Sequence, residues 1–109
     1  MKLECAGSLS SGNATEPEIR NAFADDHGRG EFIILSDAEQ VFIQASDEGD
    51  GRYTLEYREG GDDRHFQCTC DVRKAEVEAA FLKYMKRDAT WKTDFPWKKL
   101  DRKPWWRFW

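Results

Sequence analysis

The residues best suited to chemistry in this sequence are His65, Cys68 and Cys70, which lie close together along the chain. Thiolates and imidazoles bind zinc, and a thiol beside an imidazole base can act as a nucleophile. Cys5 and His27 could complete a four-ligand site, but the Cys-x₂₋₄-Cys spacing and second matching pair of structural zinc sites do not occur here. His65 precedes Cys68 by three residues, so a regular strand points their side chains to opposite faces. We therefore expect no metal and no catalytic residue among them.

The cysteines also indicate in which cellular compartment the protein is expected. Cys68 and Cys70 flank Thr69, so a regular strand holds both thiols on one face, too far apart for an unstrained disulfide. An odd number of cysteines without a disulfide framework is typical of a reducing compartment. Residues 1–5 lack the apolar core of a signal peptide, and no apolar run approaches the roughly 20 residues of a membrane-spanning helix. We expect buried core thiols in a cytoplasmic protein without a membrane span.

Two acidic segments that contain glycine, residues 47–50 and 59–63, are candidates for a cation site or a partner surface. Neither has the alternating acidic positions and distal Glu of an EF-hand. The glycines at residues 28 and 30 precede a strand, whereas a phosphate-binding loop follows a strand and opens a helix. We expect hairpin turns, no cofactor and no enzymatic activity. The acidic side chains kept as candidate partner-binding residues are Asp47, Glu48, Asp50, Asp62 and Asp63.

Aromatic and basic residues are concentrated at the C-terminus, where all five tryptophans lie. The formal net charge is −4, yet residues 1–72 hold six basic and sixteen acidic residues, whereas residues 73–109 hold eleven and five. Tryptophan buries a large apolar surface, so this segment must dock on its own domain, another protein, a membrane surface or a nucleic acid. For residues 105–109, docking on the domain and binding to a partner both stay open. The candidate partner-binding residues of this tail are Trp105, Trp106, Arg107 and Trp109.

Periodicity and turn residues predict the elements that position these groups. Thr15 and Glu18 have the spacing of a capping box, which starts a helix with the apolar stripe Ile19, Ala22 and Phe23. Four strands are predicted at residues 31–35, 41–45, 53–58 and 64–70. Asp71 is expected to cap a second helix, whose apolar face is Val77, Ala80, Phe81 and Tyr84. Residues 1–5 alternate like a short edge strand, and residues 6–14 have the composition of a flexible connector.

These elements predict a single α+β domain over residues 1–109, with an N-terminal arm at 1–14, a core at 15–99 and a basic aromatic tail at 100–109. Short connections favour antiparallel neighbours. We expect a two-layer sandwich, in which a meander of four strands, or five with residues 1–5, carries both helices on one face in the order α-β-β-β-β-α. Residues 32–35 and 41–43 are apolar on both faces of their strands, so we expect Trp91, Phe95 and Trp97 to cover the second face.

Several stretches resemble a known group of proteins. They are residues 42–45, 53–60, 65–66 and 77–81, together with Tyr84, Trp91 and the run Phe95-Pro96-Trp97. Over roughly residues 30–99 the chain resembles small bacterial proteins that are similar to the immunity proteins of polymorphic-toxin systems. The resemblance implies a bacterial cytosolic α+β protein with a toxin-neutralising role, and it carries no catalytic residue. Residues 100–109 lie outside it.

Charge and resemblance together predict a non-catalytic protein-binding module, an immunity-type inhibitor of a bacterial toxin. An acidic body would attract a basic nuclease toxin, because complementary charge speeds encounter and sets specificity. The alternative is a nucleic-acid-binding module that uses the basic, tryptophan-rich tail for phosphate contacts and base stacking.

Overall fold

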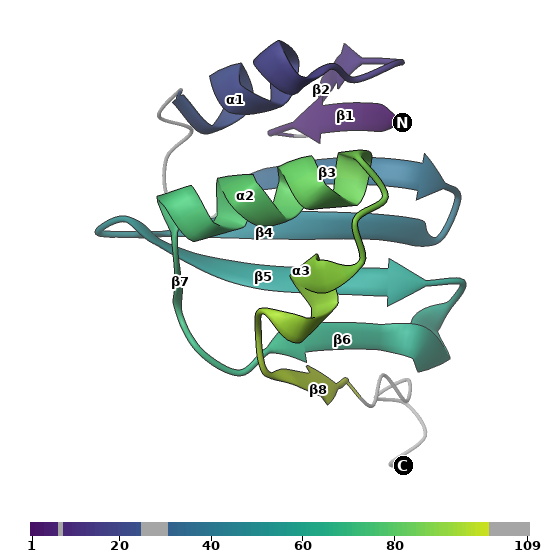
Figure 1. Cartoon of the computed structure of the whole chain (residues 1–109), viewed down its shortest axis with the longest axis vertical. Coiled ribbons are helices and arrows are strands. Elements are labelled where there is room, and N and C mark those ends of the chain that lie inside the picture. Colours follow the sequence, from purple (N-terminus) through teal and green to yellow (C-terminus); the bar gives the residue numbers. More distant parts are fainter. Residues whose placement is uncertain (7, 25–30, 101–109) are drawn as a thin grey trace, which may run out of the picture.

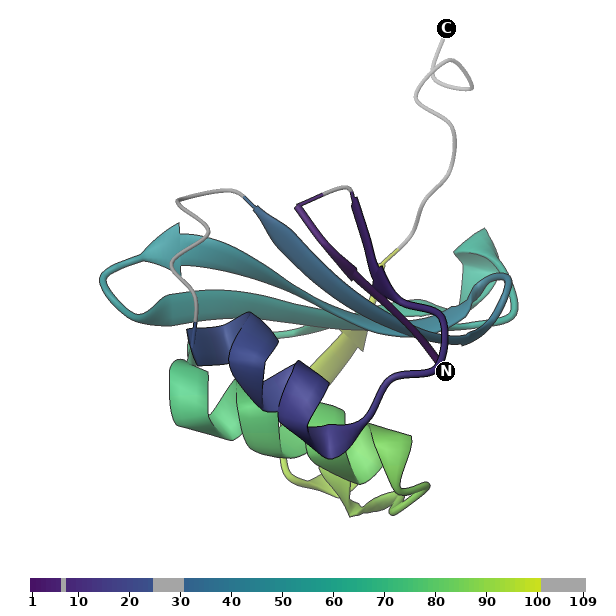
Figure 2. The same cartoon turned by 90° about the horizontal axis from the view of Figure 1, so that it is seen from above.

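The computed structural model describes residues 1–6, 8–24 and 31–100, which form an antiparallel sheet with helices on one face (Figures 1 and 2). The helices are α1 (Glu16–Ala24), α2 (Lys74–Met85) and α3 (Thr90–Thr93), and a 3-10 turn, η1, spans Asp62–Arg64. The strands are β1 (Lys2–Cys5), β2 (Ser8–Ser11), β3 (Phe32–Ala38), β4 (Val41–Gly49), β5 (Arg52–Glu59), β6 (His65–Cys68), β7 (Val72–Arg73) and β8 (Trp97–Lys99). The expected α+β class and antiparallel sheet are confirmed.

The sheet is wider than the expected meander of four or five strands. Its order is β2-β1-β3-β4-β5-β6-β8, and β7 pairs with the part of β5 that β6 does not reach. Residues 1–5 do form a strand, but β1 lies inside the sheet between β2 and β3 rather than at its edge. Residues 8–11, predicted to be a connector, form the edge strand β2 because β1 supplies its backbone hydrogen-bond partners.

Local sequence signals explain where the first helix begins. The Glu18 carboxylate accepts hydrogen bonds from the Thr15 backbone nitrogen at 3.0 Å and from the Thr15 hydroxyl at 2.9 Å, and the first of these is one half of the predicted capping box. The apolar stripe of α1, Ile19, Ala22 and Phe23, is buried as expected. These bonds lower the pKa of Glu18, because they favour the ionised carboxylate.

The second helix begins differently from the prediction. Its first residue is Lys74 and its N-cap is Arg73, whose backbone nitrogen donates to Glu76 at 3.2 Å. Asp71 is therefore not the cap. It lies three residues before the helix and forms an ion pair with Arg52 at 3.4 Å, because Val72 and Arg73 pair with β5 as β7 before the helix begins.

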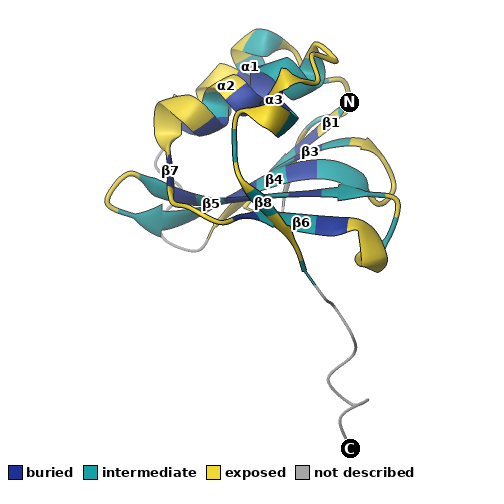
Figure 3. Cartoon of the chain, turned by 60° about the horizontal axis from the view of Figure 1, so that its bottom comes forward, coloured by how far each residue is buried: buried dark blue, intermediate teal, exposed yellow. Residues whose placement is uncertain are grey.

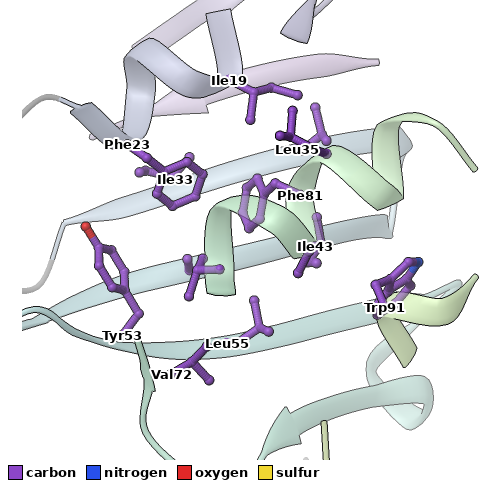
Figure 4. Close-up of a cluster of buried hydrophobic side chains, with 14 of the residues drawn as sticks. Ile19, Phe23, Ile33, Leu35, Ile43, Tyr53, Leu55, Val72, Phe81 and Trp91 are labelled. Carbon is purple, nitrogen blue, oxygen red and sulfur yellow. The ribbon is translucent and has the colours of Figure 1, made fainter. Parts of the chain in front are cut away.

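The core lies between α1, α2 and one face of the sheet. Phe23 of α1 and Phe81 of α2 meet edge to face, with ring centroids 4.9 Å apart, above Ile33, Ile43 and Leu55 of three neighbouring strands (Figure 4). All five side chains are fully or almost fully buried. In Figure 3 the buried positions gather where the helices meet the sheet, and the outward sides of the helices are exposed.

A second group of rings extends this core toward β8, and we call it the aromatic cluster: Tyr57, Phe66, Trp91 and Trp97. The Tyr57 ring centroid lies 4.8 Å from that of Phe66, 4.8 Å from that of Trp91 and 4.7 Å from that of Trp97. The Trp97 indole nitrogen donates to the Lys92 carbonyl at 2.7 Å, so the buried part of this ring keeps a polar partner.

The aromatic cluster corrects the expected position of the C-terminal segment. Trp91 and Trp97 contact Tyr57, and Phe95 contacts Trp97, so all three belong to the helix-covered side of the sheet rather than to its second face. Tyr57 shares that side with Tyr53 and Leu55 because side chains alternate along β5. The segment continues the helical layer and then adds β8 to the edge of β6.

Replacing Phe81 with Ala should lower the free energy of unfolding by about 3–5 kcal/mol, since it removes a fully buried ring that Phe23 and the sheet surround. Urea denaturation followed by circular dichroism measures this change. The matched control is Phe32→Ala, which should cost less than about 1 kcal/mol because Phe32 is 43% exposed. Equal losses in the two variants would contradict this account of the core.

Candidate functional site: the open face of the sheet

The face of the sheet opposite the helices, here called the open face, carries alternate residues of each strand in register. One row runs across five strands: Glu4, Ile34, Gln44, Glu56 and Gln67. A second row is Lys2, Ser36, Phe42, Arg58 and His65. A third is Phe32, Ser46 and Thr54. The open face is therefore mixed, with polar side chains around several apolar ones.

Exposed apolar groups gather at one corner of this face. Leu9 is 64% exposed and Phe32 is 43% exposed, and these two are the exposed large hydrophobic residues of the described chain. Leu9 lies opposite Glu4, which lies opposite Ile34, so all three share the first row. Phe32 precedes Ile34 by two residues on the same face of β3. We call Leu9, Phe32 and Ile34 the apolar corner.

Acidic side chains border the apolar corner. Glu4 stands between Leu9 and Ile34, whereas Glu31, although exposed and next to Phe32 in sequence, lies opposite Asp47 on the other face. The β4–β5 hairpin lies at the same end of the sheet, since Phe32 is opposite Ser46 of β4. Glu4 forms an ion pair with Lys2 at 3.1 Å, which partly offsets its charge.

The hairpin itself carries three predicted partner-binding residues, two of which bond within it. Asp47 accepts from the Gly49 backbone nitrogen at 2.8 Å, and Glu48 accepts from the Thr54 hydroxyl at 3.0 Å. Asp50 has φ 56° and Gly51 has φ 72°, the positive values of the tight two-residue turn that favours Asp-Gly. Glu48 belongs to the open face, as Thr54 does, whereas Asp47 lies opposite Tyr53 on the helix-covered face.

The structure does not bring the five acidic candidates together. Asp62 and Asp63 belong to η1, at the opposite end of β5 from the hairpin that holds Asp50. Eight residues of strand separate the two groups, about 25 Å at the usual rise per residue. Asp62 forms an ion pair with Arg58 at 2.9 Å, so part of its charge is balanced. Trp105, Trp106, Arg107 and Trp109 lie outside the described residues.

The opposite part of the open face holds a buried polar chain. The Arg58 Nε donates to the His65 Nδ1 at 3.0 Å, and the other ring nitrogen, Nε2, lies 2.6 Å from a Glu56 carboxylate oxygen. Since Nδ1 accepts the hydrogen bond from Arg58, the ring proton is on Nε2, which donates a hydrogen bond to the Glu56 carboxylate. His65 is 1% exposed, and its ring meets Phe42 edge to face. We call these residues the Arg58–His65–Glu56 chain.

The Arg58–His65–Glu56 chain is suited to holding strands together rather than to catalysis. Both nitrogens of His65 are engaged, so neither can take a substrate proton without breaking an existing bond. Arg58 also donates to Gln40 and lies over the Phe42 ring at 5.5 Å, which links β4, β5 and β6 on the open face. The sequence analysis did not predict the Arg58–His65–Glu56 chain. A signal was present, because Glu56 and Arg58 share one strand face and the short turn after β5 brings His65 beside them.

A double-mutant cycle tests whether Arg58 and His65 of the Arg58–His65–Glu56 chain are energetically coupled. Arg58→Met and His65→Leu should each lower the free energy of unfolding by about 2–4 kcal/mol, because each leaves a buried polar partner without its bond. The double variant should lose about 1–2 kcal/mol less than the sum of the single losses. Arg64→Met is the control and should cost under about 0.5 kcal/mol, since Arg64 is exposed and lies 3.8 Å from Glu59. Additive losses in the cycle would refute the coupling.

Other site types find little support in the described chain. Among residues 1–6, 8–24 and 31–100, no three His, Cys, Asp or Glu residues group so as to hold a metal ion. Within the same residues, no helix combines the length and apolar character needed to cross a membrane. No protein-family model, curated protein or solved structure matches this chain.

Proposed function

We propose that this chain is a non-catalytic protein-binding module that receives its partner on the apolar corner of the open face. The observation that carries the proposal is the position of Leu9 and Phe32, which share one corner of the face that the helices leave uncovered. Exposed apolar groups surrounded by polar ones are typical of protein interaction sites. A large aromatic side chain such as Phe32, exposed in the free protein and covered in the complex, can supply much of the affinity in such interfaces.

The charge around the corner indicates the chemistry of the partner. Glu4 and Glu48 of the open face border the apolar corner, and residues 1–72 as a whole are strongly acidic. A partner that presents an apolar patch ringed by Lys and Arg would complement this surface and associate rapidly at low salt. A basic nuclease toxin has this chemistry, which supports an immunity-type inhibitor role in line with the family resemblance.

The proposal predicts a binding difference between two matched variants. Phe32→Glu places a charge in the apolar corner and should weaken the complex with a basic toxin encoded beside this gene at least about thirtyfold. Ala79→Glu introduces the same residue on the exposed side of α2 and should leave affinity unchanged. Isothermal titration calorimetry measures both dissociation constants, and co-expression measures protection from the toxin.

Two results would overturn the proposal. If the unmodified chain neither binds nor protects against any neighbouring toxin, the inhibitor role is wrong. If Phe32→Glu binds as tightly as Ala79→Glu, the partner does not use the apolar corner. Circular dichroism of the unmodified chain and of both variants establishes that each is folded, which the exposed positions of Phe32 and Ala79 favour.

The alternative function, nucleic-acid binding through residues 100–109, has a separate readout. Lys98 and Lys99 are exposed on β8, directly before this basic and tryptophan-rich segment. If the alternative holds, a single-stranded oligonucleotide should quench tryptophan fluorescence at low salt, and added salt should reverse the effect. A chain truncated after Leu100 is the matched control. Quenching that persists in the truncated chain, or is absent from the full one, would count against this role.

A further inference from the structure

Cys68 and Cys70 lie much closer together than a regular strand allows. Their Sγ atoms are 3.4 Å apart, and both thiols are reduced. The expectation that a full pleat separates them is wrong, because β6 ends at Cys68 and the chain bends through residues 69–70 before β7 begins. The backbone nitrogen of Thr69 donates to the Pro96 carbonyl at 3.0 Å, in register with the β6–β8 pairs, so this residue is held against the segment just before β8.

The two thiols differ in exposure, which assigns them different roles in an exchange reaction. Cys70 is exposed at the bend, whereas Cys68 is 4% exposed and lies opposite Trp97 of β8. Burial raises the pKa of Cys68 to about 11, although a backbone hydrogen bond at Cys70 acts in the opposite direction, so its thiol keeps its proton at neutral pH. Cys70 is therefore the thiol that a dissolved reagent can reach first.

We propose that Cys68 and Cys70 form a redox-active dithiol that a small disulfide such as oxidised glutathione converts to an intramolecular disulfide. The sulfur atoms need to approach only from 3.4 Å to about 2.05 Å, and Thr69 and Cys70 lie in a bend rather than in a regular strand. A second thiol held this close has a very high effective concentration.

The reaction proceeds by two thiol–disulfide exchanges. The Cys70 thiolate attacks one sulfur of oxidised glutathione and expels one glutathione thiolate, which leaves a mixed disulfide on Cys70. Cys68 then gives its proton to solvent, attacks the Cys70 sulfur and expels the second glutathione thiolate. The protein loses two hydrogens, and one glutathione disulfide is reduced to two thiols. Cys5 takes no part, because β1 is separated from β6 by β3, β4 and β5.

Mass spectrometry of the whole chain tests the proposal. The Cys5→Ser variant is reduced, freed of reductant, exposed to oxidised glutathione, quenched with acid and alkylated. We expect a product lighter by two hydrogens, with no alkylated thiol and no glutathione attached, which dithiothreitol returns to the dithiol. A persistent glutathione adduct, or two thiols that stay free under the same conditions, would overturn the proposal.

Two further variants assign the roles of the thiols. Cys5→Ser combined with Cys68→Ser should accumulate the glutathione adduct on Cys70, because the second thiol is missing. Cys5→Ser combined with Cys70→Ser should react at least about tenfold more slowly, since the remaining thiol is buried. Equal reaction rates for the two double variants would refute the assignment. The Cys70 variant changes an exposed residue and keeps the test valid if the Cys68 variant fails to fold.

Discussion

The contact of Tyr57 with three other rings determines how the C-terminal third of the chain meets the sheet. Tyr57 lies on the helix-covered face of β5 and touches Phe66 of β6, Trp91 of α3 and Trp97 of β8. Aromatic rings bury large areas and prefer such edge-to-face and stacked arrangements. Without this cluster, α3 would lack its main anchor on the sheet, and β8 would be held mainly by three residue pairs with β6.

The same contact explains why the open face stays open. Trp91, Phe95 and Trp97 lie on the side where the helices already are, and within the described residues no helix covers the other face (Figure 2). That face instead obtains internal partners for its polar groups, as in the Arg58–His65–Glu56 chain, and leaves apolar groups exposed at the corner where β2, β1 and β3 meet. The proposed binding role and the polar chain thus arise from one distribution of aromatic residues.

Sequence reasoning predicted the features that depend on nearby residues. The Thr15–Glu18 contact is one example, and the buried stripe of α1 is another. It failed where distant partners decide the outcome. The serine-rich segment of β2 has no strand pattern of its own and is extended because β1 pairs with it. β6 ends at Cys68, and the Thr69 that follows it bonds to Pro96, 27 residues away along the chain, a contact that no local pattern indicates.

The candidate site was predictable only in part, for the same reason. Acidic hairpins were recognised from composition, but their separation by the length of β5 required the register of the sheet. Residues 32–35, apolar on both faces, did signal an unusual surface. The prediction that Trp91 and Trp97 would cover it was wrong, because the helix-covered face offered those rings Tyr57 as a partner.

The interior position of β1 has a consequence for solubility. β1 pairs with β3 along Ile33-Ile34-Leu35-Ser36, most of a short uncharged and largely apolar run that begins at Phe32. Such a run with a free edge is a template for intermolecular strand pairing and for amyloid-like aggregation. β1 occupies that edge, and the outermost position passes to β2, a strand of three serines and one leucine. By covering the edge of β3, β1 reduces the tendency of the chain to associate with itself through strand pairing.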